Sequence, residues 1–528
     1  MKNELLIRYW GRKPPNLVRN YIEKYSRKGE LILDPFGGSG SIVKTAIYLR
    51  RRAIYSDINP FAKLIAEASL IGCDCNELVR ALKKLDMSEV VFITENGLRK
   101  RLQTEKFFSI KCKCGRPNVV EKIIFSRKYR AIKKTKPSNL KNISSKVFNF
   151  ISRNKRGVTY EQLISYFRRY QHQVVSNAVT RLIKIGAIQE DIMPLRVSFN
   201  GRCQCGIKQI VNPQKLKWII DEKPLPAYWF PAYRLEYPNG RSFYKKRDVE
   251  RVDEFFTDRN LVFLSQLWDM ISKFDGNERV KNYLYLIFFM TVVKSSKMCR
   301  ESGGTWPVNS YWIPRRFVVW NPYITFKRSV AQALEAISQI RRNVKKGNVE
   351  QVLQKQADVC FLSHDATNLN LPENSIDYIV TDPPHFDEVQ FLELSFFYTA
   401  WLRSRLPFER EMVVNPAQNK GIDFYLNMVE KFSSEMHRIL KPNRYMTTIL
   451  HEENPSLLEK CTDIIESAGF KLYEFEENSN FNFYTFRKTN KTKTRVYTGN
   501  HIFSLSRFLA CIRNLFFWKN LKKGNDIF

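Results

Sequence analysis

The most constraining feature of the sequence is a glycine-rich turn enclosed by two short apolar runs. Residues 31–33 (Leu-Ile-Leu) are of strand type, and the turn at residues 34–40 (Asp-Pro-Phe-Gly-Gly-Ser-Gly) follows directly. Apolar residues then recur at helical spacing over residues 42–51. A second apolar run, residues 53–55, ends at Ser56 and Asp57. This order of strand, turn, helix, strand and acid is typical of a nucleotide-type pocket in an α/β fold.

The turn supplies the first candidate ligands of a cofactor. Gly37, Gly38 and Gly40 carry no side chains and tolerate positive φ, so a cofactor can approach the backbone closely. Asp57 stands about where an acidic residue meets ribose hydroxyls in such a site. We therefore expect Asp57 to bind the ribose.

A second motif lies far downstream and has the chemistry of amine methylation. The apolar run at residues 376–380 leads into Thr381, and Asp382-Pro383-Pro384-His385 follows; two prolines cannot continue a ladder, so the chain must leave the sheet. A carboxylate and a backbone carbonyl that accept both hydrogens of an exocyclic amine aim the nitrogen lone pair at a methyl donor. Asp382 and the carbonyl of Pro383 fit these roles. The position after the second proline needs a ring that stacks on an extruded base.

Here that ring position is His385, with Phe386 following. An imidazole can stack on a base. The alternative is a histidine satisfied by local hydrogen bonds, with Phe386 stacking instead or with no base entering.

With these two motifs the chain resembles the amino-methylating DNA methyltransferases that depend on S-adenosylmethionine. Their hallmarks are an F-x-G-x-G turn, here Phe36 to Gly40, and a [DNS]-P-P-[YFW] motif, from which His385 departs. The residues at 9–16 resemble the "WxRKP" entry of a zinc-ribbon-containing adenine-specific subgroup, and those at 255–261 resemble its "FFTxRNL" segment. Residues 389–395 and the turn at 437–442 also fit. The resemblance covers residues 1–75 and about 250–480.

The resemblance implies further cofactor ligands. The entry segment, which closes the methionine end of the pocket, contributes Tyr9, Trp10, Lys13 and Pro14, and the first motif contributes Asp34 and Phe36. Asp365 and Ala366 belong to a strand and acidic turn that hold the adenine, although an Asx turn is an alternative role for Asp365. Because the glycine turn precedes Asp382, the motif order is that of the alpha class, with the specificity elements inserted inside the catalytic domain.

Composition points to a polyanionic partner. The 528 residues include 87 Lys and Arg against 52 Asp and Glu, a net charge of +35. This excess favours phosphate contacts with a nucleic acid. The most apolar stretch, residues 283–293, is shorter than the roughly 20 residues of a spanning helix, so we expect a buried helix and no membrane. No secretory signal is apparent at the start of the sequence, so we expect a cytoplasmic, nucleoid-associated protein of prokaryotic origin.

Four of the ten cysteines form two C-x-C-G turns. Cys112 and Cys114 make the first turn, and Cys203 and Cys205 make the second. Two such turns, which we call knuckles, supply the ligands of a structural Cys₄ zinc site. Four reduced thiols without metal are the alternative.

The residues between the knuckles carry a helical pattern of their own. Residues 147–151 are apolar at helical spacing, Thr159 with Gln162 predicts a capping box, and residues 176–185 predict a third helix with Val179, Leu182 and Ile183 on one face. Three helices followed by a short strand resemble a winged helix-turn-helix. Asn177, Thr180, Arg181 and Lys184 of the third helix then face a DNA groove; a packing module for the zinc ribbon is the alternative.

Residues 215–345 mix aromatic and basic residues. Such a mixture suits a surface that grips opened DNA, and it suits a core equally well. The loop at residues 303–307 (Gly-Gly-Thr-Trp-Pro) is a candidate recognition element.

The sequence therefore predicts a Rossmann-like methyltransferase sheet that is interrupted by a zinc-ribbon, winged-helix and target-recognition region. The expected parts are 1–75 and 346–487 for the methyltransferase domain, 76–215 for the zinc ribbon with the winged helix at about 143–195, 216–345 for recognition, and 488–528 for a basic tail. The expected reaction is methylation of an exocyclic amine of double-stranded DNA. Adenine N6 is favoured over cytosine N4, because Asp382 stands where the cytosine enzymes more often have Ser. A restriction or defence system is the expected setting, and an RNA methyltransferase or an inactive DNA-binding subunit are the rivals.

Overall fold

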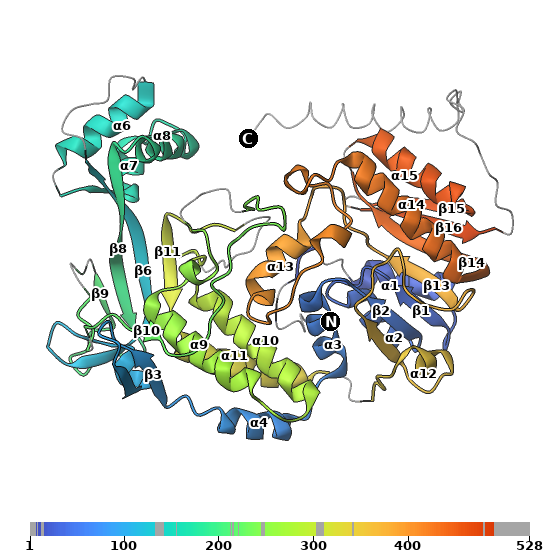
Figure 1. The fold of residues 1–528 in the computed structure, drawn as a ribbon, viewed down its shortest axis with the longest axis horizontal. Coiled ribbons are helices and arrows are strands. Elements are labelled where there is room, and N and C mark those ends of the chain that lie inside the picture. The colour runs from blue at the N-terminus through green and yellow to red at the C-terminus, as the bar shows by residue number, and fades with distance from the viewer. Residues whose placement is uncertain are drawn as a thin grey trace, which may run out of the picture. The chain divides into compact units, whose positions relative to one another are not determined.

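The largest sheet of the described residues has seven strands in the order β12-β2-β1-β13-β14-β16-β15 (Figure 1). The computed structural model describes residues 7, 9–11, 15–132, 142–154, 156–211, 213, 216–219, 221–243, 249–301, 311–340, 343–452, 454–478 and 481–489. The strands from β12 to β14 pair in parallel, and β16 is antiparallel to both of its neighbours. The strands are β1 Leu31–Asp34, β2 Arg52–Ser56, β12 Val359–Leu362, β13 Ile376–Thr381, β14 Leu440–Leu450, β15 Phe470–Asn478 and β16 Phe481–Lys488.

Helices cover both faces of this sheet, because successive strand residues point to opposite sides. Ile32 and Tyr378 pack into one apolar core, which includes residues of α1 (Pro15–Tyr25), α2 (Ser41–Tyr48) and α3 (Pro60–Ile71). Leu31, Leu33 and Ile379 pack into another core, with α12 (Val349–Leu353), α14 (Ile422–Ile439) and α15 (Pro455–Ser467). The prediction of an α/β layered fold is confirmed.

The long insertion runs from α3 to β12 and builds two further sheets. One has the order β10-β3-β4, and the other has the order β11-β6-β8-β9, with β5 and β7 also paired to β6. Its elements up to the second knuckle are α4 Cys75–Lys84, β3 Glu89–Ile93, β4 Arg99–Gln103, α5 Thr104–Phe107, β5 Ser109–Lys111, β6 Pro117–Ala131, α6 Asn142–Arg153, β7 Val158–Thr159, α7 Tyr160–Tyr166, α8 His172–Lys184 and β8 Ile188–Phe199. The rest are β9 Gln209–Val211, β10 Leu225–Pro226, α9 Asp258–Ser272, α10 Glu278–Ser295, β11 Arg316–Trp320 and α11 Pro322–Ser338.

The helices α9, α10 and α11 share one hydrophobic core with α3 and α13 (Phe391–Thr399), which adjoin the seven-stranded sheet in the sequence. Phe61 of α3 stacks on Tyr398 of α13 at 4.0 Å between ring centroids, and it meets Phe289 of α10 edge-on at 5.7 Å. The apolar stretch at residues 283–293 lies inside α10 and is largely buried, as predicted. Among the described residues, no helix combines the length and the apolar character needed to cross a bilayer.

The predicted elements around the two motifs are present with small shifts. Strand β1 and strand β2 coincide with the predicted apolar runs, whereas α2 ends at Tyr48, three residues before the predicted end. The helix stops there because Arg50 adopts a φ of 63° and the Arg51 amide turns back to the carbonyl of Ala46. Strand β13 delivers Thr381 to its carboxyl end as expected.

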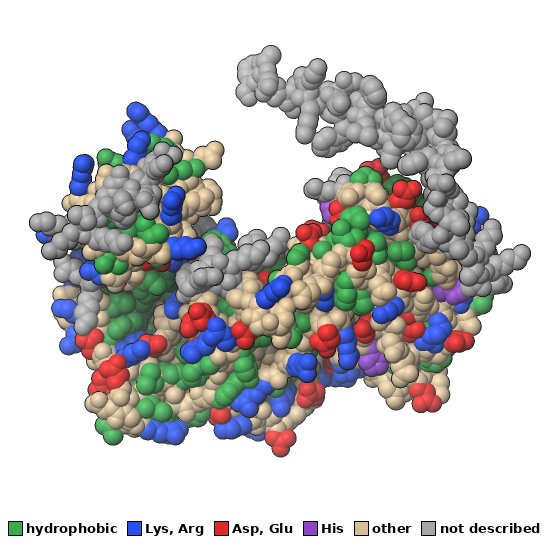
Figure 2. Space-filling model, turned by 45° about the horizontal axis from the view of Figure 1, so that its top comes forward, with side chains coloured by type: hydrophobic (Ala, Val, Ile, Leu, Met, Phe, Trp, Pro, Cys, Tyr) green, Lys and Arg blue, Asp and Glu red, His purple; other side chains and the backbone are tan. Residues whose placement is uncertain are grey.

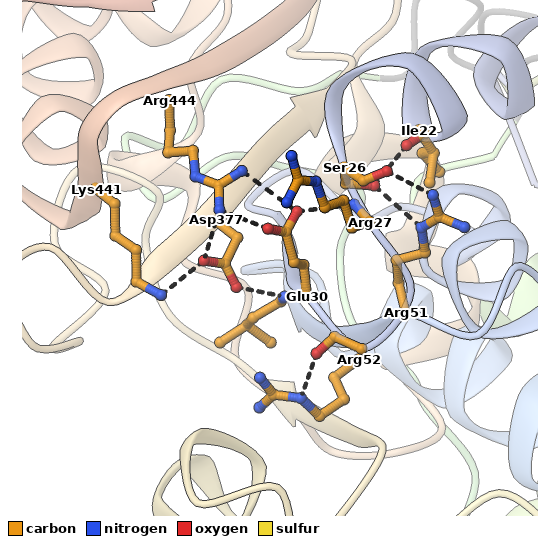
Figure 3. A network of polar contacts seen from close by, with 11 residues as sticks. Ile22, Ser26, Arg27, Glu30, Arg51, Arg52, Asp377, Lys441 and Arg444 are labelled. Atoms are coloured by element: carbon orange, nitrogen blue, oxygen red, sulfur yellow. Dashed lines mark hydrogen bonds and ion pairs between the residues drawn. The ribbon is translucent and has the colours of Figure 1, made fainter.

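A polar cluster ties the two separated parts of the sheet at the amino ends of β1 and β13 (Figure 3). Asp377 accepts a hydrogen bond from the Leu31 amide at 2.8 Å and another from Lys441 Nζ at 2.6 Å. Arg444 lies 3.7 Å from the same carboxylate and also pairs with Glu30. Because the Asp377 side chain is only 8% exposed, these partners compensate the cost of burying its charge.

Candidate active site

Four acidic residues meet at the carboxyl ends of four neighbouring parallel strands. Asp34 ends β1, Asp57 follows β2, Asp365 follows β12 and Asp382 follows β13. All four line a pocket of about 900 Å³, counted with the solvent at its mouth. Strand order reverses between β1 and β13, and ligands of open α/β sheets bind at such a switch point.

The glycine turn holds Asp57 in place. The amide of Gly38, whose φ is 47°, donates to Asp57 Oδ2 at 2.8 Å, and the amide of Asn59 donates to Oδ1 at 2.8 Å. Burial raises the pKa of Asp57 to about 6, although both amides act in the opposite direction. The carboxylate therefore faces the pocket in a fixed orientation with lone pairs left to accept further hydrogen bonds.

At two of the three glycines, packing within the protein already leaves no room for a side chain. A Cβ on Gly37 would lie 2.1 Å from the Tyr55 ring, and one on Gly40 would lie 2.8 Å from Ala66. Only at Gly38 is the neighbour a wall of the pocket, namely Tyr9 at 3.3 Å. Gly37 and Gly38 line the pocket, whereas Gly40 is not among its lining residues and packs against α3. The role of the three glycines at the cofactor stays a prediction.

Asp34 is the most deeply buried acid of the pocket, with 1% of its surface exposed. Its Oδ1 accepts hydrogen bonds from Thr381 Oγ1 at 2.8 Å and from the Phe36 amide at 3.3 Å. Burial, together with the charges of Asp382 and Asp57, raises the pKa of Asp34 to about 8 against the effect of these two donors. A cation in the pocket would relieve this cost.

Aromatic rings from the entry segment and from α13 form one wall. Tyr9 stacks on Phe391 at 6.0 Å and meets Trp10 edge-on at 5.4 Å. The Asn59 amide group donates to the Tyr9 hydroxyl at 3.2 Å and thereby fixes the ring. Tyr9 and Trp10 line the pocket with Phe36, as expected, whereas Lys13 and Pro14 lie outside the described residues.

Asp365 and Ala366 also line the pocket. Asp365 Oδ1 accepts hydrogen bonds from the amide and the hydroxyl of Thr367, at 2.9 and 2.8 Å. The Asx turn is therefore present, and it leaves Oδ2 of the same carboxylate without a part in the turn.

The segment after β13 carries the second motif. His385 Nε2 lies 3.2 Å from Asp382 Oδ1, and the two side chains are 11% and 17% exposed. Pro384 lines the pocket and its carbonyl accepts a hydrogen bond from Tyr425 at 2.8 Å, whereas Pro383 is buried outside the lining. Asp382 thus stands between the pocket and the imidazole of His385.

Phe386 does not compete with His385 for a base. It is 5% exposed and stacks on Tyr425 at 4.2 Å, with a φ of 42° that turns its side chain into the core. The alternative in which Phe386 stacks on the base is wrong, because the ring is already packed on both its tyrosine neighbour and the sheet core.

Residues 3–68 match an N6/N4 family model described as DNA methylase. The Type II methyltransferase M.MjaII of Methanocaldococcus jannaschii is 37% identical over 79 residues, which are 15% of this chain and 14% of that protein. Both matches support a relationship to DNA methyltransferases and leave the methylated base, N6 or N4, open.

Solved structures resemble only parts of the chain. The antibiotic-resistance methyltransferase Kmr is 10% identical, with 25% of this chain and 60% of that chain covered and a TM-score of 0.16. TrmN from Thermus thermophilus is 15% identical, with 31% of this chain and 34% of that chain covered and a TM-score of 0.15. Scores this low do not establish a common overall fold.

The motifs did not indicate several residues at the site. Arg410, Glu411, Met412 and Met428 line the pocket from a turn and from α14. His451, at the end of β14, lies edge-on to His385 at 6.2 Å between ring centroids. A sequence signal exists only for His451, because residues that directly follow a parallel strand gather at the same edge of the sheet.

The four predicted cysteines come together. Their sulfurs lie within 4.8 Å of one another, with Cys112 Sγ 3.8 Å from Cys205 Sγ and Cys114 Sγ 3.6 Å from Cys203 Sγ. A tetrahedral Zn²⁺ with bonds of about 2.3 Å separates its sulfurs by roughly 3.8 Å. The donor set and its spacing fit zinc.

Between the knuckles, helices α6, α7 and α8 surround a small apolar core. The capping box of Thr159 and Gln162 is present. Helix α8 begins at His172, four residues earlier than predicted, and Ile183 is 37% exposed instead of buried. The strand that follows, β8, is long, because it pairs along the length of β6.

The exposed side of α8 is basic. Asn177, Arg181 and Lys184 are exposed, and so is Thr180, although its hydroxyl lies 3.5 Å from Arg315 Nη2. Arg168 and Arg169 in the preceding turn are exposed as well. Figure 2 shows Lys and Arg side chains around the part of the molecule that holds these helices.

The aromatics of residues 215–345 mostly belong to the core. Tyr237, Phe243, Tyr311 and Phe317 are at most 4% exposed. Tyr237 donates to Glu393 of α13, so these rings hold the insertion against the segment after the second motif. Tyr233, at 45% exposed, is an exception. The loop at residues 303–307 lies outside the described residues.

Proposed function

We propose that the protein transfers a methyl group from S-adenosylmethionine to an exocyclic amine of a base extruded from double-stranded DNA, with adenine N6 as the preferred atom. The observation that carries this proposal is the convergence of Asp34, Asp57, Asp365 and Asp382 on one pocket at the switch point of the sheet. The match of residues 3–68 to DNA methylases supports the same class.

The pocket fits the cofactor. Gly38 leaves room beside Tyr9, the acids supply acceptors for hydroxyl, amino and ammonium groups, and the aromatic wall suits the apolar parts. In this proposal Asp57 binds the ribose, Asp365 and Ala366 hold the adenine, and Tyr9, Trp10 and Phe36 line the methionine side together with Asp34. The bound cofactor supplies an electrophilic methyl on a sulfonium centre.

Asp382 and the Pro383 carbonyl then prepare the amine. Each accepts one N–H of the target, so the nitrogen lone pair is no longer held in conjugation with the ring. The carboxylate of Asp382 stabilises the positive charge that develops on nitrogen, and the proton then leaves to solvent. His385 stacks on the extruded base, with its Nε2 3.2 Å from Asp382 Oδ1 in the free protein.

We also propose that the insertion binds the duplex whose base enters the pocket. The Cys₄ cluster would hold a structural zinc between β5, β6 and β8, and the winged-helix-like module of α6–α8 would present Arg181 and Lys184 to the duplex. Arg181→Ala with Lys184→Ala should weaken binding of any duplex and reduce the salt dependence by about two phosphate contacts. An unchanged salt slope would make the module a packing unit of the zinc ribbon.

The reaction is tested with labelled S-adenosylmethionine, duplex DNA and structured RNA, followed by identification of the methylated nucleoside by mass spectrometry. Asp382→Asn should abolish transfer, whereas Asp387→Asn, an exposed carboxylate five positions on, should retain it. N6-methyladenine in DNA is the expected product. N4-methylcytosine would change the target base, product in RNA alone would change the substrate, and equal activity of Asp382→Asn would reject the site.

A further inference from the structure

Two buried carboxylate oxygens in the pocket have no hydrogen-bond partner among the described residues. They are Asp34 Oδ2 and Glu411 Oε2. Asp34 is 1% exposed and Glu411 is 3% exposed, and both residues line the same pocket. A buried carboxylate oxygen without a donor is costly, so the pair indicates a ligand that brings hydrogen-bond donors.

Glu411 is held in position by its other oxygen. Its Oε1 accepts a hydrogen bond of 2.8 Å from the Leu392 amide, in the first turn of α13. Phe391, the residue before, stacks on Tyr9. The unpartnered Oε2 therefore belongs to a fixed group beside the aromatic wall, not to a mobile surface side chain.

Lys420 compensates this carboxylate in part, because its charge lowers the pKa of Glu411. Lys420 is buried nearby, but its ammonium donates to the backbone carbonyls of Phe408 and Glu411. The Gln418 amide is close enough to lower the pKa of Glu411 without forming a hydrogen bond of good geometry. Burial nevertheless raises that pKa to about 7, and the charge of Asp57 acts in the same direction.

We propose that Glu411 and Asp34 together bind the α-ammonium of the methionine part of the cofactor. This inference rests on the proposed function. An ammonium carries three N–H donors and one positive charge, which matches two acceptor oxygens on two acids. Arg410, the neighbouring basic residue of the pocket, is exposed and is left to meet the carboxylate of the same amino acid group.

The test compares two ligands by isothermal titration calorimetry. S-adenosylhomocysteine contains the amino acid group, and 5′-methylthioadenosine has the same nucleoside and thioether without it. Glu411→Gln should weaken S-adenosylhomocysteine by about 10- to 100-fold, because a charge-assisted contact is lost. It should change the affinity for 5′-methylthioadenosine by less than about 2-fold. Glu409→Gln, an exposed neighbour, is the matched control and should alter neither.

Three results would overturn the inference. Equal loss of both ligands would mean that Glu411 acts through Leu392 and α13, and no loss of either would mean that Oε2 does not meet the ligand. If the wild-type protein binds neither ligand, the proposed function fails together with the inference. Glu411→Asp keeps the charge on a shorter side chain and should show a smaller selective loss, which keeps the test open if Glu411→Gln folds poorly.

Discussion

The hydroxyl of Thr381 donates to Asp34 Oδ1 at 2.8 Å, although the two residues are 347 positions apart. Thr381 is fully buried and immediately precedes Asp382. The same short bond thus joins the strand that ends in the proposed methionine subsite to the strand that carries the proposed base-holding acid. In the proposed reaction, Thr381 of β13 would thus link the cofactor side of the pocket to the acid that holds the base.

Thr381→Val should remove this bond with little change in shape. Asp34 would keep the Phe36 amide as the remaining donor of Oδ1, so we expect a loss of about 1–2 kcal/mol in the free energy of unfolding and weaker binding of S-adenosylhomocysteine. Urea denaturation and calorimetry measure both. Thr448→Val is the control, because Thr448 is the paired residue of β14 and its buried hydroxyl has no partner among the described residues. An equal effect of both substitutions would contradict the role given to Thr381.

The ligand-free protein should lose stability as pH rises from about 4 to 8. The pKa of Asp34 is about 8 in the folded protein against an ordinary value of 3.8, so the folded state keeps a proton that the unfolded state releases. The contribution of Asp34 to the free energy of unfolding is complete below about pH 4 and is lost as the pH rises through about 8. Urea midpoints at unit steps of pH should fall across this window, and Asp34→Asn should flatten the slope while Asp387→Asn does not. A urea midpoint of the wild-type protein that rises steadily from about pH 4 to 8 would contradict the raised pKa of Asp34.

Replacement of His385 separates stacking from hydrogen bonding. His385→Phe keeps a ring and should retain kcat/KM within about tenfold, whereas His385→Ala should lose about 10- to 100-fold, because a base–ring stack contributes about 1–3 kcal/mol. Methyl transfer to duplex DNA under single-turnover conditions is the measurement. Full activity of His385→Ala would leave the base without a stacking partner at this position and would reject the assignment.

Purified protein should contain about one zinc per chain by elemental analysis. Cys112→Ser and Cys203→Ser should lower that content and the thermal midpoint, because both residues are buried members of the cluster. Cys461→Ser, which changes a buried cysteine elsewhere, should leave the zinc content unchanged. Protein that is fully folded with no metal in the wild type would favour four reduced thiols.

Asp377→Asn should destabilise the sheet without touching the pocket. It replaces an oxygen that accepts from Lys441 and weakens the link to the Leu31 amide, so we expect a loss of about 2–4 kcal/mol in the free energy of unfolding. Asp269→Asn breaks the solvent-exposed pair with Lys273 and should cost less than about 1 kcal/mol. Similar losses in the two variants would show that the cluster of Figure 3 is an ordinary surface network.

The sequence was most informative where neighbouring residues alone determine the backbone path, as at glycine turns, proline pairs and helix caps. The strand before Asp34, the glycine turn and the two prolines after Asp382 each specify their own backbone path, so these elements could be predicted. The capping box at Thr159 is another local signal that the structure contains. The two C-x-C turns contact each other through cysteines that are 89 and 93 positions apart. Their pairing could still be predicted, because four cysteines in two such turns are typical of a metal site.

Other features depend on partners that are remote in sequence. Glu411 reaches the pocket only because Leu392 and Lys420 fix its turn, and no motif marks it. The aromatic residues of the insertion could not be divided between surface and core until Tyr237 was seen to contact α13. The burial of Phe386 follows from Tyr425, which lies on a helix that begins well beyond the motif.

The hydrogen bond between Leu31 and Asp377 spans 346 positions, so during synthesis it can form only long after Leu31 has been made. At a synthesis rate of about 5–20 residues per second, roughly 20–70 seconds separate the emergence of β1 from that of its partner β13. During this interval β1 can pair with β2, but its other edge, which will meet β13, is open. The Cys₄ and helical modules emerge in the same interval and can fold first. A ribosome that pauses or terminates inside the insertion releases a chain with an open sheet edge, so the first third of this protein should depend on chaperones until the last third is made.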